Sequence, residues 1–118
     1  MKLTVLITEG PYNHQASDSA WQLIQAAMEA GHEIRGVFFY NDGVYNVTNR
    51  MDPPQDDRHI ANRWAALGEQ GVDIVVCIAA AKRRGMVDDL LVPNSRISGL
   101  GQLAKMVIES DRLVVFGD

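Results

Sequence analysis

The chain has 118 residues, of which 47% are hydrophobic, and a formal charge of −4 at pH 7. This length and apolar content are sufficient for one buried core, so we expect a single domain over residues 1–118. The acidic balance argues against direct binding of nucleic acid, and the apolar runs are too short for a membrane span or a signal peptide.

The first predicted elements are a strand, a helix and a second strand. The runs "LTVLI" at residues 3–7 and "IRGVFFY" at 34–40 are rich in β-branched or aromatic residues, which is typical of strands. Between them, residues 17–30 repeat apolar side chains along one helical stripe, and Gly31 stands where a helix commonly ends. This pattern predicts a β-α-β unit.

The same alternation continues to the end of the chain. Residues 56–71 have the periodicity of a second helix, and "DIVVCIA" at 73–79 is a third apolar run. Residues 98–110 predict a third helix, which leads to the last strand, "RLVVF", at 112–116. Three of the four runs are nearly continuous in apolar residues, as in parallel strands that are covered on both faces.

Alternating strands and helices predict an α/β fold with an open, mostly parallel sheet and helices on both faces. In the common strand order 2-1-3-4, the ligand crevice lies at the carboxyl edge between the first and third strands. The loops expected to meet there are "TEGPYNHQ" at 8–15 and "AAAKRRG" at 79–85, and the turn "NDGVYN" at 41–46 is expected to flank them. Tyr12 and His14 are therefore candidate crevice residues.

Cys77 is the only cysteine, and it stands near the expected carboxyl end of the third strand. A single cysteine cannot form an internal disulfide, which favours a reducing, cytoplasmic location. Lys82, Arg83 and Arg84 follow it, and nearby cations or a helix N-terminus favour the reactive thiolate form. Free cysteine is also among the residue types most often buried in cores. The residues alone leave a reactive thiol and an inert core residue as open alternatives.

Other chemistries find little support in the residues. The stretch "GLGQL" at 99–103 lacks a third glycine and a preceding predicted strand, so we interpret it as a helix start rather than a phosphate loop. The three histidines share no metal-ligand spacing with one another or with Cys77, and no serine elbow is present. The first loop lacks the Ser/Thr-rich phosphate cradle of a flavin-binding domain. We expect no metal and no cofactor.

Five stretches together resemble a known family: "EGPYNHQASDSAWQ", "VFFYNDGVYN", "PPQDDRHIANRWA", "VVCIAAAKRRG" and "ISGLGQL…DRLVVFGD". The chain resembles the DsrE/TusD sulfurtransferase family, most closely its DsrE branch, over nearly its whole length. The resemblance implies a cytoplasmic protein of flavodoxin-like fold that carries sulfane sulfur as a cysteine persulfide. Matching motif to motif places the family's sulfur-carrying cysteine on Cys77.

The resemblance also implies partners. Subunits of the DsrE branch join DsrF-like and DsrH-like paralogues in a heterohexamer with two copies of each, and they pass sulfur to a DsrC-like carrier in dissimilatory sulfur oxidation. The TusD branch forms an equivalent complex and serves 2-thiolation of the tRNA wobble uridine through a TusE-like carrier. In both branches the acceptor is a protein thiol, so no direct contact with nucleic acid or membrane is expected.

The chain departs from the family after "RRGMVDD" at residues 83–89. Relatives usually carry a longer polar segment there, before the helix at 98–110. Because this segment follows Cys77 in the chain, the departure bears on access to the thiol and on docking of a carrier.

Our hypothesis is that Cys77 accepts sulfane sulfur and yields it to a carrier thiol. Arg83, Arg84 or Lys82 would stabilise the thiolate and the anionic persulfide, while Tyr12 and His14 either complete the crevice or serve as loop scaffolding. Two alternatives stay open, namely a TusD-type relay and a non-catalytic assembly subunit in which Cys77 is buried.

Overall fold

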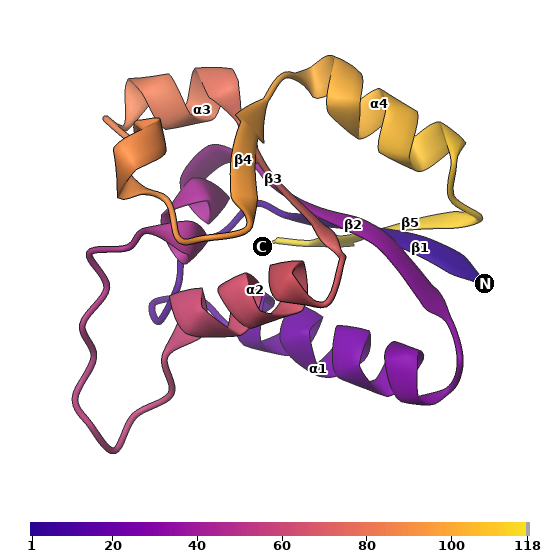
Figure 1. Cartoon of the computed structure of the whole chain (residues 1–118), viewed down its shortest axis with the longest axis horizontal. Helices are drawn as coiled ribbons and strands as arrows, with labels where there is room; N and C mark the ends of the chain where they lie inside the picture. Colours follow the sequence, from indigo (N-terminus) through magenta and orange to yellow (C-terminus); the bar gives the residue numbers. More distant parts are fainter. Residues whose placement is uncertain (118) are drawn as a thin grey trace.

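The computed structural model describes residues 1–117 and contains one parallel sheet of five strands (Figure 1). The strands are β1 (Lys2–Ile7), β2 (Glu33–Phe39), β3 (Asp73–Cys77), β4 (Ser95–Ser98) and β5 (Arg112–Phe116). Their order across the sheet is β4-β3-β2-β1-β5, and every neighbouring pair is parallel. The predicted α/β class, with an open parallel sheet, is confirmed.

Helices connect the strands. The α-helices are α1 (Ala16–Glu29), α2 (Ile60–Glu69), α3 (Ile78–Arg83) and α4 (Leu100–Ile108), and two 3-10 helices are η1 (Asn41–Val47) and η2 (Asp88–Leu90). The three predicted helices correspond to α1, α2 and α4. Sequence analysis missed α3, because its six residues are too few for a clear amphipathic period.

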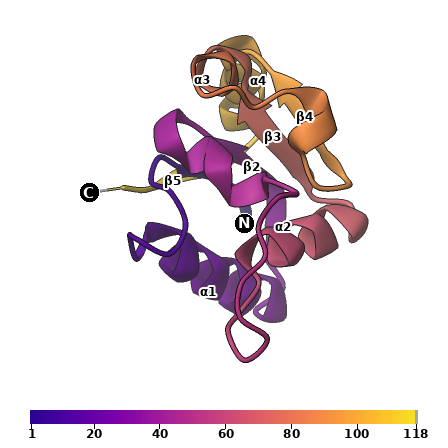
Figure 2. The same cartoon turned by 90° about the vertical axis from the view of Figure 1, so that its left-hand side faces the viewer.

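The helices cover both faces of the sheet, as predicted (Figure 1). Parallel crossovers are almost always right-handed, so the two connections that step from β1 to β2 and from β2 to β3 place α1 and α2 on the same face. The connection from β4 to β5 returns across the sheet in the other direction and places α4 on the opposite face. Between η1 and α2, residues 48–59 form a long loop that extends away from the sheet (Figure 2).

The core lies mainly between the sheet and the α1–α2 layer. Trp64 of α2 is fully buried and packs edge-to-face against Phe39 of β2 and Trp21 of α1, with ring centroids 5.2 Å and 5.5 Å apart. Edge-to-face aromatic pairs contribute roughly 1 kcal/mol each beyond the area that they bury. This cluster therefore fixes both helices to the sheet and sets the position of the strand ends above them.

The predicted strand order 2-1-3-4 is wrong. β2 lies between β1 and β3, and the extra strand β4 extends the sheet beyond β3. Sequence analysis missed β4 because its four residues, "SRIS", contain one apolar side chain and lie at the sheet edge, so they carry no strand pattern. The first and third strands are consequently not neighbours, and the predicted crevice between them does not exist.

The short segment after α3 is tied to the η1 region. Thr48 and Leu91 form an isolated antiparallel bridge, and the Asn49 side-chain amide donates to the carbonyl oxygens of Asp89 (2.8 Å) and Leu91 (3.5 Å). Val92 N–H donates to the Val47 carbonyl oxygen at 2.9 Å. The chain therefore passes from α3 to β4 along a path that η1 and the residues after it hold in place.

Candidate functional site at the end of β3

Cys77 is the last residue of β3 and also the N-terminal cap of α3. The aliphatic run that ends at Cys77 favours a strand, whereas the three alanines that follow are strong helix formers, so the chain changes conformation at this residue. Its φ of −63° and ψ of 125° are still extended. The predicted strand end at residue 79 is thus two residues too late.

The starts of two helices flank this position. Cys77 pairs with Ser98 of β4, and Gly99, the next residue, is the N-terminal cap of α4. From these adjacent strand ends, α3 and α4 run toward opposite sides (Figure 1). The Cys77 side chain makes no capping hydrogen bond and Gly99 has no side chain, so neither cap neutralises the first N–H groups of its helix, which carry partial positive charge. The positive ends of two helix dipoles thus lie at the strand end that carries Cys77.

The side chain of Cys77 is closed to solvent, with 1% of its surface exposed. It belongs to the buried core cluster together with Val75 and Val76 of its own strand and Ala80 and Ala81 of α3. A reaction partner therefore reaches the sulfur only when neighbouring groups move.

The three predicted cations do not gather at the sulfur. Lys82 and Arg83 belong to the last turn of α3, about 7.5 Å or more along the helix axis from Cys77. Both are exposed, and neither makes an ion pair with a residue that the structure describes. Arg84 instead donates from Nε to Asp42 Oδ1 at 2.7 Å and from Nη1 to the Ala80 carbonyl oxygen at 3.0 Å.

The loop after β1 lies elsewhere. Tyr12 adopts a φ of 69°, and its hydroxyl donates to the Arg58 carbonyl oxygen at 2.7 Å and accepts from Ile60 N–H at 3.4 Å. His14 Nε2 lies 3.5 Å from Glu9 Oε2. Tyr12 thus fastens the loop that precedes α2, and the prediction that residues 8–15 and 79–85 meet is wrong.

The element between those two loops is η1, where the sequence predicted only a turn. Asn46 is fully buried and donates from Nδ2 to the Glu9 carbonyl oxygen at 3.0 Å, whereas Asp42 holds Arg84 on the other side. Gly43 is required, because a Cβ there would overlap the Ile7 carbonyl oxygen. The residues "NDG" after the second strand indicate a turn at this place. They do not show that η1 lies between the other two loops, because that depends on the order of the strands.

A hollow of about 190 Å³ is lined by Ile78, the residue after Cys77, although Cys77 itself does not line it. Its lining comes from α3, the segment after it and β4, namely Ile78, Lys82, Met86, Val87, Asp88 and Ile97. We call it the α3–β4 hollow. Because Ile78 follows Cys77 directly and Ile97 precedes its strand partner Ser98, the hollow adjoins the sulfur-bearing end of β3.

A larger hollow of about 580 Å³ lies at the opposite, amino edge of the sheet, between the ends of α1 and α2. The charged side chains at this edge form ion pairs with one another. Burial opposes ionisation of Asp73, but hydrogen bonds and charge from Arg96 and Arg35 outweigh it and keep the pKa of Asp73 below its usual value. This paired arrangement offers no uncompensated group for chemistry, so Cys77 remains the candidate reactive residue.

Within residues 1–117, no group of three or more histidine, cysteine or acidic side chains is arranged to hold a metal ion. In the same residues, no helix has both the length and the apolar content to cross a bilayer.

Comparisons with known proteins extend over the whole chain. The model of the DsrE/DsrF-like family matches residues 1–116. The chain is 58% identical to the putative sulfurtransferase DsrE of Allochromatium vinosum, with 100% of both chains covered. It is 38% identical to the sulfurtransferase TusD of Klebsiella pneumoniae, with 98% of this chain and 100% of that protein covered.

Two solved structures share the fold. The YchN protein of E. coli superimposes with a TM-score of 0.88 at 21% identity, over 98% of this chain and 99% of that one. A protein of unknown function from Methanobacterium thermoautotrophicum, MTH1491, gives 0.75 at 19% identity, over 97% of each chain.

The alignment with the Allochromatium protein spans 130 positions against the 118 residues of this chain. That relative therefore contains residues that this chain lacks, in agreement with a longer segment in relatives. The place of the difference, expected after Asp89, stays a prediction.

Proposed function

Because the chain belongs to the DsrE/DsrF-like family, we propose that it is a sulfurtransferase subunit that carries sulfane sulfur on Cys77. The observation that carries this proposal is the position of the only thiol, at the end of a central strand between the starts of α3 and α4. Relatives named DsrE and TusD are both described as sulfurtransferases, which supports group transfer rather than ligand binding alone.

The proposed reaction has two balanced steps. The Cys77 thiolate attacks the outer sulfur of a donor persulfide, the donor's S–S bond breaks, and its electron pair leaves with the donor thiolate. A new S–S bond now joins Cys77 Sγ to the transferred sulfur. An acceptor thiolate then attacks that outer sulfur, and Cys77 leaves as a thiolate, so no oxidant, metal or cofactor is consumed.

The residues around the sulfur have separate roles in this proposal. The first N–H groups of α3 and α4 stabilise the thiolate and the anionic persulfide. Lys82, Arg83 and Arg84 raise the positive potential of the approach from a greater distance, and Lys82 and Arg83 are available to a bound partner because no described side chain pairs with them. Tyr12 and His14 act as loop scaffolding rather than as crevice residues.

The pathway that we favour is dissimilatory sulfur oxidation with a DsrC-like carrier as acceptor. The higher identity to the Allochromatium DsrE than to TusD favours this route over 2-thiolation of tRNA. By the same comparison we propose a cytoplasmic heterohexamer with DsrF-like and DsrH-like subunits, two copies of each.

An uncovered apolar surface supports assembly. The exposed face of α4 and the edge strand β5 present large apolar side chains to solvent, namely Leu100, Ile108, Leu113 and Val115. We call this set the α4–β5 surface. Ile108 is 83% exposed and Val115 55%, and a concentration of large exposed apolar side chains on two consecutive elements is common at protein interfaces.

The test of the proposal is sulfur loading. After incubation with inorganic polysulfide, intact mass spectrometry of the protein is expected to show the addition of one sulfur atom, and the Cys77→Ser variant is expected to show none. Addition that persists in Cys77→Ser, or no addition to the unaltered protein from an active donor, contradicts the assignment.

A further inference from the structure

We propose that the α3–β4 hollow is the docking site for the thiol-bearing segment of the acceptor protein, and that it takes one apolar side chain with an acidic residue beside it. This inference rests on the proposed function, since it concerns how the acceptor of the second step is recognised. Cys77 alone cannot select an acceptor protein, so a separate recognition site is needed.

The size of the hollow favours a side chain over a small molecule. Its volume of about 190 Å³ lies below the roughly 300–1,000 Å³ of typical ligand pockets. Four of its six lining residues are apolar: Ile78, Met86, Val87 and Ile97. An apolar side chain that enters it exchanges water contact for contact with these residues.

The apolar rim is exposed although the rest of the core is closed. Ile78 is 41% exposed and Val87 57%, and both line the hollow. Ile78 is also the residue directly after Cys77, so a segment anchored on Ile78 and Val87 lies one residue along the chain from Cys77, and its thiol reaches the buried sulfur when the cover of Cys77 opens. The exposed apolar side chains of the hollow thus lie close in the chain to Cys77, where the acceptor must bind for the second transfer step.

The positive charge beside the hollow favours an acidic residue next to the apolar side chain of the partner. Lys82 lines the hollow, Arg83 is adjacent, and neither forms an ion pair within residues 1–117. Most other arginines, by contrast, are satisfied by carboxylates, namely Arg35, Arg58, Arg63, Arg84 and Arg96. Asp88 also lines the hollow and repels an acid, so an acidic residue of the partner belongs beside Lys82 of α3.

The experiment measures which acceptor the loaded protein prefers. The protein is first loaded on Cys77 with inorganic polysulfide and then mixed with a set of synthetic peptides of equal length, each with one cysteine. The parent peptide carries a leucine and a glutamate beside the cysteine, one relative replaces the leucine with serine, and another replaces the glutamate with lysine. The readout is the ratio of transfer rates between peptides, in which the general reactivity of the persulfide cancels.

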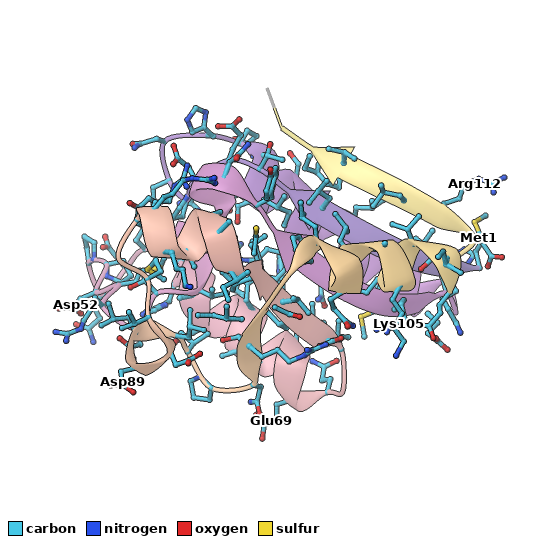
Figure 3. All side chains as sticks on the ribbon, turned by 90° about the horizontal axis from the view of Figure 1, so that it is seen from above. Met1, Asp52, Glu69, Asp89, Lys105 and Arg112 are labelled. Carbon is cyan, nitrogen blue, oxygen red and sulfur yellow. The ribbon has the colours of Figure 1, made fainter. Side chains whose placement is uncertain are left out.

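The unaltered protein is expected to prefer the parent to the serine peptide by about tenfold, the value of burying one aliphatic side chain. Val87→Ser should bring that ratio close to one, and Lys82→Glu should reverse the preference between the glutamate and lysine peptides. Leu23→Ser and Lys105→Glu are the matched controls, since both residues are exposed and lie outside the hollow. Figure 3 places Lys105 at the end of the molecule away from Asp89, which belongs to the segment after α3.

Equal rates for all peptides, or the same loss of preference in the two control variants, overturn the docking site and leave the proposed function intact. A change in sedimentation of the chain alone on Val87→Ser, with peptide preference unchanged, assigns the hollow to contacts between copies and also overturns it. A failure of polysulfide to load the unaltered protein is the separate result that removes the proposed function.

Discussion

Cys77 lies where two helices begin, but solvent does not reach its side chain. The 1% exposure of the residue keeps any reagent away in the closed conformation. Reactivity is then governed by how often the cover opens. Local opening of a few residues costs far less free energy than global unfolding.

The buried position of Cys77 predicts how fast a thiol reagent modifies it. A small thiol reagent should modify it in the native state, at a rate below that of free cysteine and at urea concentrations well below the unfolding transition. The check is the rate of mass increase at several urea concentrations beside an unfolding curve from circular dichroism. Labelling that occurs only as the fold itself is lost would favour the inert assembly subunit.

The secondary structure elements differ in how far the sequence predicts them. β1, β2, β3 and β5 are apolar runs, so pattern alone locates them within one or two residues at most ends. β4 contains a single apolar residue, Ile97, and exists because β3 offers an open edge, which is a tertiary cause without a local signal.

The sequence likewise predicts one part of the candidate site and not the other. The position of Cys77 near its strand end follows from the sequence to within two residues, because a lone thiol before an alanine run is a local feature. That Arg84 turns to Asp42, and that η1 separates Tyr12 from the thiol, depends on β2 lying between β1 and β3. No local pattern of residues determines that order.

At the amino edge, an ion network joins β2, β3, β4 and α4 and predicts a pH dependence of stability. Arg96 contacts Asp73 at 2.9 Å, and Arg35 joins Asp73 (3.4 Å) to Glu109 (2.8 Å). Burial opposes the charge on Asp73, but the two arginines outweigh it and lower its pKa below the usual 3.8. Because the pKa of Asp73 is lower in the folded than in the unfolded state, the charged group stabilises the fold at a pH above the unfolded-state pKa. This stabilisation is lost as the pH falls toward and through the folded-state pKa.

The Asp73→Asn variant is therefore expected to lose about 1 kcal/mol of unfolding free energy at neutral pH and to show a weaker decline below about pH 4. Urea unfolding at a series of pH values measures both effects. Asp52→Asn is the control, because Asp52 is exposed and forms no ion pair with a described residue. Parallel acid profiles for the two variants would show that the network does not stabilise the fold.

At the scale of the whole molecule, the two sheet faces are covered unequally. α1 and α2 lie on one side, and the shorter helices α3 and α4 lie on the other (Figure 1), where the side chains of the α4–β5 surface stay exposed. The hollow proposed for acceptor docking lies near Asp89, and Arg112 and Lys105 mark the opposite end of the molecule in Figure 3. Leu100 begins α4 near the strand end of Cys77, whereas Ile108 ends α4 and Leu113 adjoins Arg112, so assembly through Ile108 and Leu113 leaves the hollow open.

This separation predicts the effect of a charge on the α4–β5 surface. Ile108→Glu should weaken association with DsrF-like and DsrH-like subunits by at least about tenfold, because it places a charge without a partner in an apolar interface. Sedimentation velocity of mixed subunits measures the effect, with Leu23→Glu on α1 as control. Equal complex formation by both variants would move the interface to another face.

The pairing of β5 with β1 has a consequence for synthesis of the chain. β5, the last strand, hydrogen-bonds along β1, the first, from Leu3 beside Arg112 to Ile7 beside Phe116, and Thr8 N–H donates to the Phe116 carbonyl oxygen at 3.1 Å. During synthesis, β1 therefore has one unpaired edge until β5 has been made. Completion of the sheet is a late and nonlocal event, and nascent chains halted before β5 should depend on chaperones to stay unaggregated.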